Sequence, residues 1–329
     1  MPNLTPTIYD VAREAGVSIA TVSRVLNFPL RVNSKTRTTV MKAIDLLGYV
    51  PKAESRARAL KETRRIGVLI PFFTAPSFVQ RLRGIAAVLN QNDYEMVIYP
   101  VDSRLREQSY LETLPIRKDI DGLIIVSQVV DSSIAKRLVD NDLETVVIEF
   151  NDPHFTTLEI DDKEGGYIAT KFLVEKGYKR IAFIGGRQQP DFGVNPIIKR
   201  MEGYRKVLTE SQISIPKEYA NEYVHNPGQL LIDLIPLGLP LAFFAATDLQ
   251  AIALLKEARK LNLLIPEDIA IIGFDDIDMA EYLGLTTIHQ PLDESGRIAA
   301  EILISRLINP KQTIQHIQLP LSIVERETV

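Results

Sequence analysis

From Arg65 onward, short apolar runs alternate with amphipathic stretches, and this alternation restricts the fold more than any other feature of the 329-residue chain. Runs rich in β-branched and aliphatic residues, such as Ile66–Ile70 and Gly122–Val126, predict buried strands. Between them, apolar residues recur at helical spacing, as in Phe78–Asn90. Such alternation is typical of a doubly wound parallel sheet with right-handed crossovers.

The alternation restarts in the middle of the chain, which predicts a second sheet. The first set has strands at 66–70, 96–99, 122–126 and 146–150, with helices at 78–90, 104–114 and 132–139. The second has helices at 164–176, 197–208, 249–261 and 299–307, with strands at 180–184, near 223, at 241–245, 269–274 and 317–325. Two such sheets in tandem form a cleft where strand ends and loops converge.

The N-terminal stretch Thr7–Asn27, TIYDVAREAGVSIATVSRVLN, predicts two short helices around a tight turn. Thr7 and Asp10 have the spacing of a capping box. Gly16 suits a left-handed turn, and Ser18 can cap the second helix. The outer face of that helix carries Ile19, Ala20, Ser23 and Arg24. A small or hydroxylated face with an arginine suits the major groove, so we interpret the stretch as a helix-turn-helix. The alternative is a helical hairpin within a core.

Charge favours the DNA-reading interpretation. Residues 1–65 carry 12 basic and 5 acidic side chains, a net charge of +7, whereas the remainder has a net charge of −11. A basic head on an acidic body suits a protein that holds a polyanion at one end. A third helix is predicted from Asn33 or Ser34 to about Leu47. We expect Lys35 and Arg37, at its start, to contact phosphates.

Several classes of protein are disfavoured. The chain has no cysteine, which excludes disulfides and thiolate sites, and its four histidines lack metal-ligand spacing. We expect no cofactor and no catalysis, because neither a dinucleotide-binding glycine motif nor a P-loop occurs, so a nucleotide-dependent enzyme is a remote alternative. No signal segment or membrane-spanning apolar run is present. This predicts a cytoplasmic protein without membrane contact and argues against a secreted sugar-binding protein.

Many separate motifs in one order resemble the lactose-repressor/galactose-repressor family of bacterial transcription regulators over nearly the full length. They are TIYDVAREAGVSIATVSRVLN (7–27), VNSKTR (32–37), GYVPK (48–52), RIGVLIP (65–71), RLRGI (81–85), DGLII (121–125), GYKRIAFIGG (177–186), KRMEGYRKVL (199–208), FAATDLQAIALL (244–255), IPEDIAIIGFDDI (265–277) and TTIHQPLDESGRIAAEIL (286–303). No single motif would suffice, but the set is specific.

The resemblance implies a small all-α helix-turn-helix head and an α/β body of two doubly wound parallel-sheet lobes, similar to a periplasmic sugar-binding protein. We expect a DNA-binding domain at 1–50, a hinge at 51–64 and an effector and dimerisation domain at 65–329. The N-lobe would comprise about 65–161 and 292–318, and the C-lobe about 162–290 and 319–329. Crossings between lobes are expected near Asp161, Gln290–Pro291 and Leu319–Pro320.

The same resemblance assigns roles to residues of the head. Ile19, Ala20 and Arg24 match the positions at which the family reads bases, and Arg24 is suited to a bidentate contact with guanine, with phosphate binding as its alternative. Tyr9 belongs either to the core or to a phosphate contact. Backbone contacts or caps are expected at Thr7, Ser18, Thr21, Ser23 and Asn27.

The hinge departs from the family pattern. Relatives usually place a leucine nine residues after the tyrosine of the GY-P motif, where it wedges into a central minor-groove step. Here that position is Arg58, and Leu60 lies two residues later. Three alternatives remain: Leu60 acts after a local shift, Arg58 enters the minor groove as a cation, or the wedge is absent.

In the cleft, Arg200 and Asp275 match positions that the family uses to hold sugar hydroxyls, and a guanidinium and a carboxylate suit vicinal hydroxyls. Asp248 is expected to line the same cleft, with Asp161 or Asp162 as further candidates. One of Phe72, Phe73 and Phe78 is expected to stack on a sugar face. Gln290 and Pro291 are assigned to hinge geometry. Helices near 78–90 and 132–139 are candidates for the dimer face.

These residues predict a repressor that binds a pseudo-palindromic operator as a homodimer and is controlled by a sugar or sugar derivative. The alternative is an activator or co-repressor-dependent regulator of the same architecture, with a non-sugar effector such as a nucleoside. The loop from Gln188 to Pro196 and the segment from His225 to Gln229 depart from many relatives, which argues against the common monosaccharides.

Overall fold

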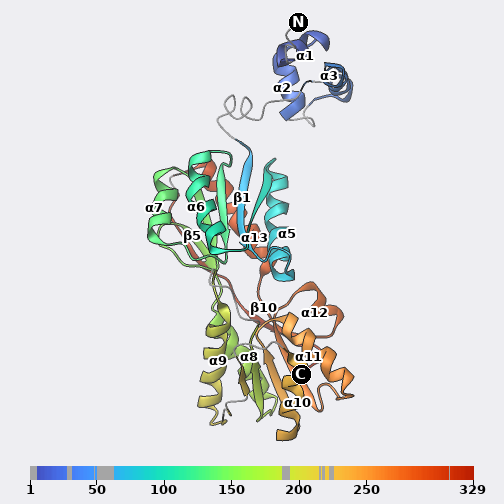
Figure 1. Cartoon of the computed structure of the whole chain (residues 1–329), viewed down its shortest axis with the longest axis vertical. Coiled ribbons are helices and arrows are strands. Elements are labelled where there is room, and N and C mark those ends of the chain that lie inside the picture. The colour runs from blue at the N-terminus through green and yellow to red at the C-terminus, as the bar shows by residue number, and fades with distance from the viewer. Residues whose placement is uncertain are drawn as a thin grey trace. The chain divides into compact units, whose positions relative to one another are not determined.

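The structure, a computed structural model, describes residues 6–27, 32–47, 49, 63–186, 193–214, 216, 219–221, 226–310 and 312–329. The chain divides into two compact units, residues 1–63 and 64–329. In the first unit, α1 (Ile8–Glu14), α2 (Ile19–Asn27) and α3 (Ser34–Leu47) pack around one small core (Figure 1). That core contains Val11, Ala12, Ala15, Val22, Val25, Val40, Ala43 and Ile44.

The predicted caps of the head helices are present. The carboxylate of Asp10 accepts hydrogen bonds from the amide of Thr7 at 2.9 Å and from its hydroxyl at 2.7 Å. These bonds hold the pKa of Asp10 below its usual value. Ser18 Oγ accepts from the amide of Thr21 at 3.1 Å, so it caps α2 as expected. Asn33, rather than Ser34, caps α3, because Asn33 Oδ1 accepts from the amide of Thr36.

One lobe of the larger unit is a six-stranded parallel sheet in the order β11-β5-β4-β3-β1-β2. Its strands are β1 (Arg65–Pro71), β2 (Glu95–Val101), β3 (Gly122–Val126), β4 (Glu144–Ile148), β5 (Thr156–Glu159) and β11 (His316–Gln318). Helices α5 (Pro76–Gln91) and α13 (Leu292–Ile308) cover one face, and α6 (Arg104–Arg117) and α7 (Ser132–Asp140) cover the other (Figure 1). We call this the N-lobe.

Helices α5 and α13 approach each other so closely that only glycine fits at their crossing. A Cβ added to Gly84 would lie 1.9 Å from the carbonyl oxygen of Asp293. One added to Gly296 would lie 2.1 Å from the carbonyl oxygen of Arg81. This packing fixes the start of α13, which follows a crossing between the lobes, against the middle of α5.

The other lobe, here called the C-lobe, is a sheet in the order β12-β10-β9-β8-β6-β7. Its strands are β6 (Ile181–Ile184), β7 (Ala220–Asn221), β8 (Leu241–Ala245), β9 (Ile269–Asp275), β10 (Thr286–His289) and β12 (Ser322–Val324), and only β12 pairs antiparallel. Helices α8 (Asp162–Glu175) and α9 (Pro196–Glu210) cover one face, and α10 (Pro227–Leu234) and α11 (Asp248–Lys260) cover the other. The short η3 (Ile235–Leu237) follows α10, and α12 (Asp278–Tyr282) follows β9.

The predicted alternation is confirmed, although the sequence missed five of the described elements: β5, α10, η3, α12 and β10. β5 and β10 have threonine-rich sequences, TTLE and TTIH, without a contiguous apolar run, and become buried only because sheet neighbours cover them. The strand expected at 146–150 lies at Glu144–Ile148. Tyr223, the centre of another expected strand, lies outside the described residues. The chain passes between the lobes after β5, after β10 and after β11.

Candidate functional sites

The outer face of α2 is open in the head. Ile19, Ala20 and Arg24 are exposed, while Thr21 and Ser23 are half-buried. Val22 and Val25 on the inner face are buried at 0% and 3% exposure, which fixes the orientation of the helix. This is the pattern of a helix that presents one face to a partner and anchors the other in a core.

The remaining residues predicted to contact DNA are placed as follows. Thr7, Ser18 and Lys35 are exposed, and Arg37 is half-buried on α3. Asn27 is the last residue of α2, and its side chain is not described. Arg58 and Leu60 lie in residues 51–62, outside the described part of the chain, so the three hinge alternatives stay open.

A pocket lies between the two lobes. Its lining is Pro71, Phe72, Ser77, Phe78, Arg81, Ser127, Glu149, Gly193, Val194, Pro196, Ile197, Arg200, Thr247, Asp275 and Gln290. Its volume of about 110 Å³ is below the roughly 300–1,000 Å³ of typical ligand sites. The lobes thus lie close together around this pocket.

The lobes are in contact at two places. The amide of Val194 donates to the carbonyl oxygen of Ser127 at 3.0 Å. On α5, Gln80 Oε1 accepts a hydrogen bond from the backbone amide of Asp278 at 3.2 Å. Arg83 Nη1, also on α5, donates to a carboxylate oxygen of Asp278 at 2.8 Å. These polar contacts join the two lobes, and separation of the lobes would break them.

The N-lobe wall combines two rings with a buried ion pair. The rings of Phe72 and Phe78 have centroids 6.2 Å apart, and Phe72 adopts a positive φ of 44° just after β1. Arg81, only 3% exposed, pairs with Glu149, and its Nε donates to Ser295 Oγ at 3.1 Å. Glu149 also accepts from the hydroxyl of Ser127. Burial opposes ionisation of Glu149, but the Arg81 charge and the Ser127 hydrogen bond hold its pKa below the usual value.

The C-lobe wall is organised by Arg200 of α9. Its Nε donates to Asp162 Oδ1 at 2.8 Å, and its Nη1 donates to the carbonyl oxygen of Ala246 at 2.6 Å. Asp275 Oδ1 lies 3.7 Å from Nη1 and accepts a hydrogen bond from the amide of Gln290. Burial raises the pKa values of Asp162 and Asp275, although the Arg200 charge opposes the rise in both. A fixed guanidinium, a carboxyl and two aromatic rings therefore meet at one pocket.

Four residues named as candidates for the cleft do not line this pocket: Asp161, Asp162, Asp248 and Phe73. Asp162 instead pairs with Arg200. Asp161 is exposed and caps α8, because its Oδ1 accepts from the amide of Glu164 at 2.9 Å. Asp248 is fully buried: Oδ1 accepts from the Thr287 hydroxyl at 2.6 Å and Oδ2 from the amide of Ile277 at 2.9 Å. Both oxygens are thus engaged within the C-lobe. Phe73 is exposed but does not line the pocket either.

Sequence reasoning missed five polar residues of the lining: Ser77, Arg81, Ser127, Glu149 and Thr247. Arg81 lies on an amphipathic helix, where a cation is normally read as solvent-exposed, and Ser127 and Glu149 follow strands without any motif. Gln290, which was assigned to hinge geometry, also lines the pocket. The one usable signal was position, since side chains just beyond the carboxyl ends of parallel strands converge on such a crevice.

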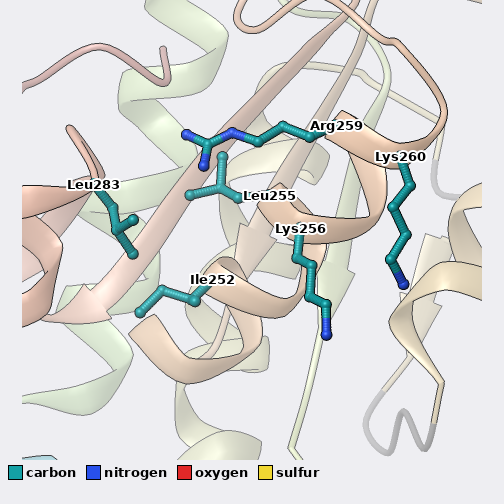
Figure 2. Close-up of a pocket in the computed structure, with 6 residues that line it drawn as sticks. All are labelled: Ile252, Leu255, Lys256, Arg259, Lys260 and Leu283. Atoms are coloured by element: carbon teal, nitrogen blue, oxygen red, sulfur yellow. The ribbon is translucent and has the colours of Figure 1, made fainter.

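A second hollow lies on the surface of the C-lobe at α11. Figure 2 shows Ile252, Leu255 and Leu283 at this site, with Arg259 extending toward Leu283 while Lys256 and Lys260 point away. Its lining contains no hydrogen-bond-accepting side chain. It therefore lacks the paired donors and acceptors that orient a small polar ligand.

Within the described residues, no group of three or more histidines and carboxylates could hold a metal ion. No helix among them has the length and apolar character needed to span a membrane.

Comparisons with known proteins agree with this architecture. A profile described as "Bacterial regulatory proteins, lacI family" matches residues 7–52, and one described as "Periplasmic binding protein-like domain" matches residues 170–329. The ribose operon repressor of Escherichia coli (strain K12) is 34% identical over 97% of this chain and 98% of its own. The HTH-type transcriptional repressor PurR of Vibrio vulnificus (strain CMCP6) is 31% identical over 98% of both chains.

Solved structures give the same picture. The lac repressor dimer bound to operator and the anti-inducer ONPF is 25% identical, with a TM-score of 0.75 and coverage of 99% of both chains. A LacI family transcriptional regulator from Enterococcus faecium with bound ribose is 28% identical, with a TM-score of 0.69. That match covers 80% of this chain and 98% of the other.

Proposed function

Because the chain belongs to the lacI family of bacterial regulatory proteins, we propose that it represses transcription as a homodimer on a pseudo-palindromic operator. We further propose that a neutral, sugar-like effector in the inter-lobe pocket controls this binding. The observation that carries the effector assignment is the meeting of Arg200, Asp275 and two phenylalanine rings at the pocket between the lobes. We propose that the chain acts by binding DNA and not by catalysis, because its relatives are named as transcriptional repressors.

The head reads DNA through α2. Ile19, Ala20 and Arg24 are exposed on the face opposite the core, so they can approach base edges when the helix enters the major groove. Arg24 binds guanine, for which a guanidinium is the best-suited side chain. Lys35 and Arg37 on α3 bind phosphates, which orient the head without reading sequence. Two identical heads related by a twofold axis require two similar half-sites.

The pocket suits a polyhydroxylated ligand. Arg200 supplies donors and Asp275 supplies an acceptor within 3.7 Å of each other, which matches vicinal hydroxyl groups. The Phe72 and Phe78 rings supply an apolar surface for the face of a sugar ring. Arg81 and Glu149 neutralise one another, so the N-lobe wall adds no unbalanced charge to attract an ionic ligand.

A nucleoside is the second candidate. The two rings, with centroids 6.2 Å apart, also suit stacking on a nucleobase. The same architecture would then act with a nucleoside as inducer or co-repressor. Uridine and ribose in one ligand screen separate the two candidates.

We assign the dimer face to α5 or α7, the two candidate helices, which cover opposite faces of the N-lobe sheet. Val79 on α5 and Val139 on α7 are 48% and 50% exposed, so each helix carries an apolar side chain for a partner to cover. The solved relative bound to operator is a dimer, which supports the same assembly for this chain.

Two measurements test the proposal. Selection of binding sites from random DNA with the full chain should return two inverted half-sites. Recovery of single or asymmetric half-sites contradicts DNA binding by a homodimer.

A thermal-shift screen with ribose, other neutral sugars, uridine and ribose 5-phosphate should give a ligand that raises Tm by mass action. The ligand must also change operator affinity in a gel-shift titration, and a ligand that raises Tm without this effect contradicts the effector assignment.

A further inference from the structure

One buried side chain beside the pocket has no hydrogen-bond partner. Gln128 follows Ser127 at the end of β3 and is 0% exposed. Among the residues that the structure describes, neither its amide nitrogen nor its carbonyl oxygen has a hydrogen-bond partner. A buried amide without partners destabilises the folded chain, because both groups lose their hydrogen bonds to water. Such a group needs either a function or a bound molecule to explain it.

The amide lies directly beneath the contact that joins the lobes at this edge of the pocket. Gly193, which lines the pocket, has a φ of +87°, and a Cβ added there would lie 3.5 Å from Gln128 Nε2 and 3.0 Å from the carbonyl oxygen of Ser127. The amide of the next residue, Val194, donates to that same carbonyl. Residues 193–194 of the C-lobe therefore cover Gln128 of the N-lobe.

The charged groups of the pocket contrast with Gln128. Arg81 and Glu149 pair with each other, and Arg200 donates to Asp162 and to a backbone carbonyl. Asp275 accepts from Gln290. Gln128, which lies behind Gly193 and not in the lining itself, thus holds a donor and an acceptor without partners, whereas each charged side chain of the pocket already has at least one partner.

We propose that Gln128 is a specificity-determining residue of the effector site, and that its amide binds a neutral effector group that both donates and accepts a hydrogen bond. This inference rests on the proposed effector function of the pocket. Separation of the lobes breaks the Val194–Ser127 hydrogen bond and uncovers the amide. Reclosure around the ligand then gives both amide groups a partner, so ligand binding favours the closed arrangement.

Two sources of this chemistry are distinguishable. A sugar hydroxyl donates and accepts through one oxygen, whereas the amide edge of a pyrimidine base presents a separate donor and acceptor. Ribose and uridine represent the two. The phosphate of an anionic ligand such as ribose 5-phosphate can accept from the amide nitrogen, but its ionised oxygens offer no donor to the carbonyl oxygen of Gln128.

The test uses the full chain with Gln128→Leu, which keeps the size of the side chain and removes both polar groups. In the absence of ligand, Tm should rise, because an unpaired buried amide is replaced by an apolar group. Affinity for the ligand found with the wild-type chain should fall at least tenfold in calorimetry. Gln128→Met serves as a second variant if the leucine variant does not fold. Gln108→Leu, at an exposed position on α6, is the matched control and should change neither quantity.

The outcomes separate the inference from the proposed function. If the wild-type chain binds ribose or uridine and Gln128→Leu binds it equally well, the inference is wrong and the effector function stands. A lower Tm for the ligand-free variant also overturns the inference, because it shows that the amide already has a stabilising partner. A wild-type chain that binds none of the probes contradicts both.

Discussion

The guanidinium carbon of Arg200 lies 3.5 Å from the centroid of the Phe274 ring. Phe274 and Asp275 are consecutive residues of β9, and consecutive strand residues normally point to opposite faces. Asp275 departs from strand geometry with a φ of +122°, and its carboxylate also comes within 3.7 Å of Arg200. Phe274 and Asp275 therefore both position the Arg200 guanidinium. The Phe274 ring stacks on the face of the guanidinium, and the Asp275 carboxylate lies near its Nη1.

Replacement of the ring should weaken effector binding without affecting DNA. In Phe274→Leu the guanidinium keeps its hydrogen bonds but loses the stacked face, a contact worth about 0.5–2 kcal/mol. Effector affinity should therefore fall by roughly 2- to 30-fold in calorimetry. Phe172→Leu, which removes a ring under Lys176 on the surface of α8, is the control. Equal affinity in the wild type and Phe274→Leu would show that the ring does not position Arg200.

The head offers a prediction that separates base reading from phosphate binding. Arg24→Ala should weaken binding to the selected operator by roughly 1–3 kcal/mol and relax preference at one position of each half-site. Lys35→Ala should weaken binding to all sequences alike and reduce the dependence of log affinity on log salt concentration by about one unit. Gel-shift titrations at several salt concentrations measure both effects. An unchanged sequence preference in Arg24→Ala assigns that arginine to phosphate.

Buried Asp248 predicts a pH dependence of stability. Burial, and then the nearby charge of Asp275, raise the pKa of Asp248 to about 8, whereas an aspartate in the unfolded chain titrates near 4. The folded chain thus binds more protons in this interval, so the free energy of unfolding should fall as pH rises from about 4 to about 8. The limiting slope is about 1.4 kcal/mol per pH unit.

Urea unfolding at pH 5, 6.5 and 8 measures this dependence. Asp248→Asn should flatten the profile above pH 6, because an amide does not titrate. Asp275, whose pKa burial raises to about 6, contributes the slope that remains at lower pH. Parallel profiles for the two chains would mean that Asp248 is ionised in the folded state.

The head was predictable from sequence because its determinants are local. Thr7 contacts Asp10 and Ser18 contacts Thr21, each three residues apart, so capping rules apply directly. The alternation of strands and helices was similarly readable, since each buried strand such as β1 is a continuous apolar run.

The pocket was only partly predictable because its contacts join distant residues. Arg81 meets Glu149 across 68 positions and Ser295 across 214, and no local pattern encodes such pairs. Asp248 was expected to line the cleft because it follows the carboxyl end of β8, but hydrogen bonds to Thr287 and Ile277 turn its carboxylate into the lobe. The position of a residue at a strand end predicts that it lies near the cleft. Whether its side chain points into the cleft depends on the hydrogen-bond partners available to it.

A last prediction concerns the lobe contact made by Arg83. This guanidinium on α5 donates to both carboxylate oxygens of Asp278 on α12 and to those of Asp293 at the start of α13. Asp278 belongs to the C-lobe, so the ion pair favours the closed arrangement. Its groups are roughly half exposed, and such pairs are typically worth only about 0.2–1 kcal/mol. Arg83→Ala should therefore weaken effector affinity by about 1.5- to 5-fold, and less at high salt.

A double-mutant cycle identifies the pair as the cause. Asp278→Asn should have a similar effect on effector affinity, and Arg83→Ala combined with Asp278→Asn should add little to either change. Arg297→Ala is the matched control, because Arg297 pairs with Glu294 and Glu301 within α13 and makes no contact across the lobes among the ion pairs of the described residues. Calorimetry at two salt concentrations measures all four variants. Additive losses, or an equal loss in Arg297→Ala, would assign the effect to overall charge instead of to closure of the lobes.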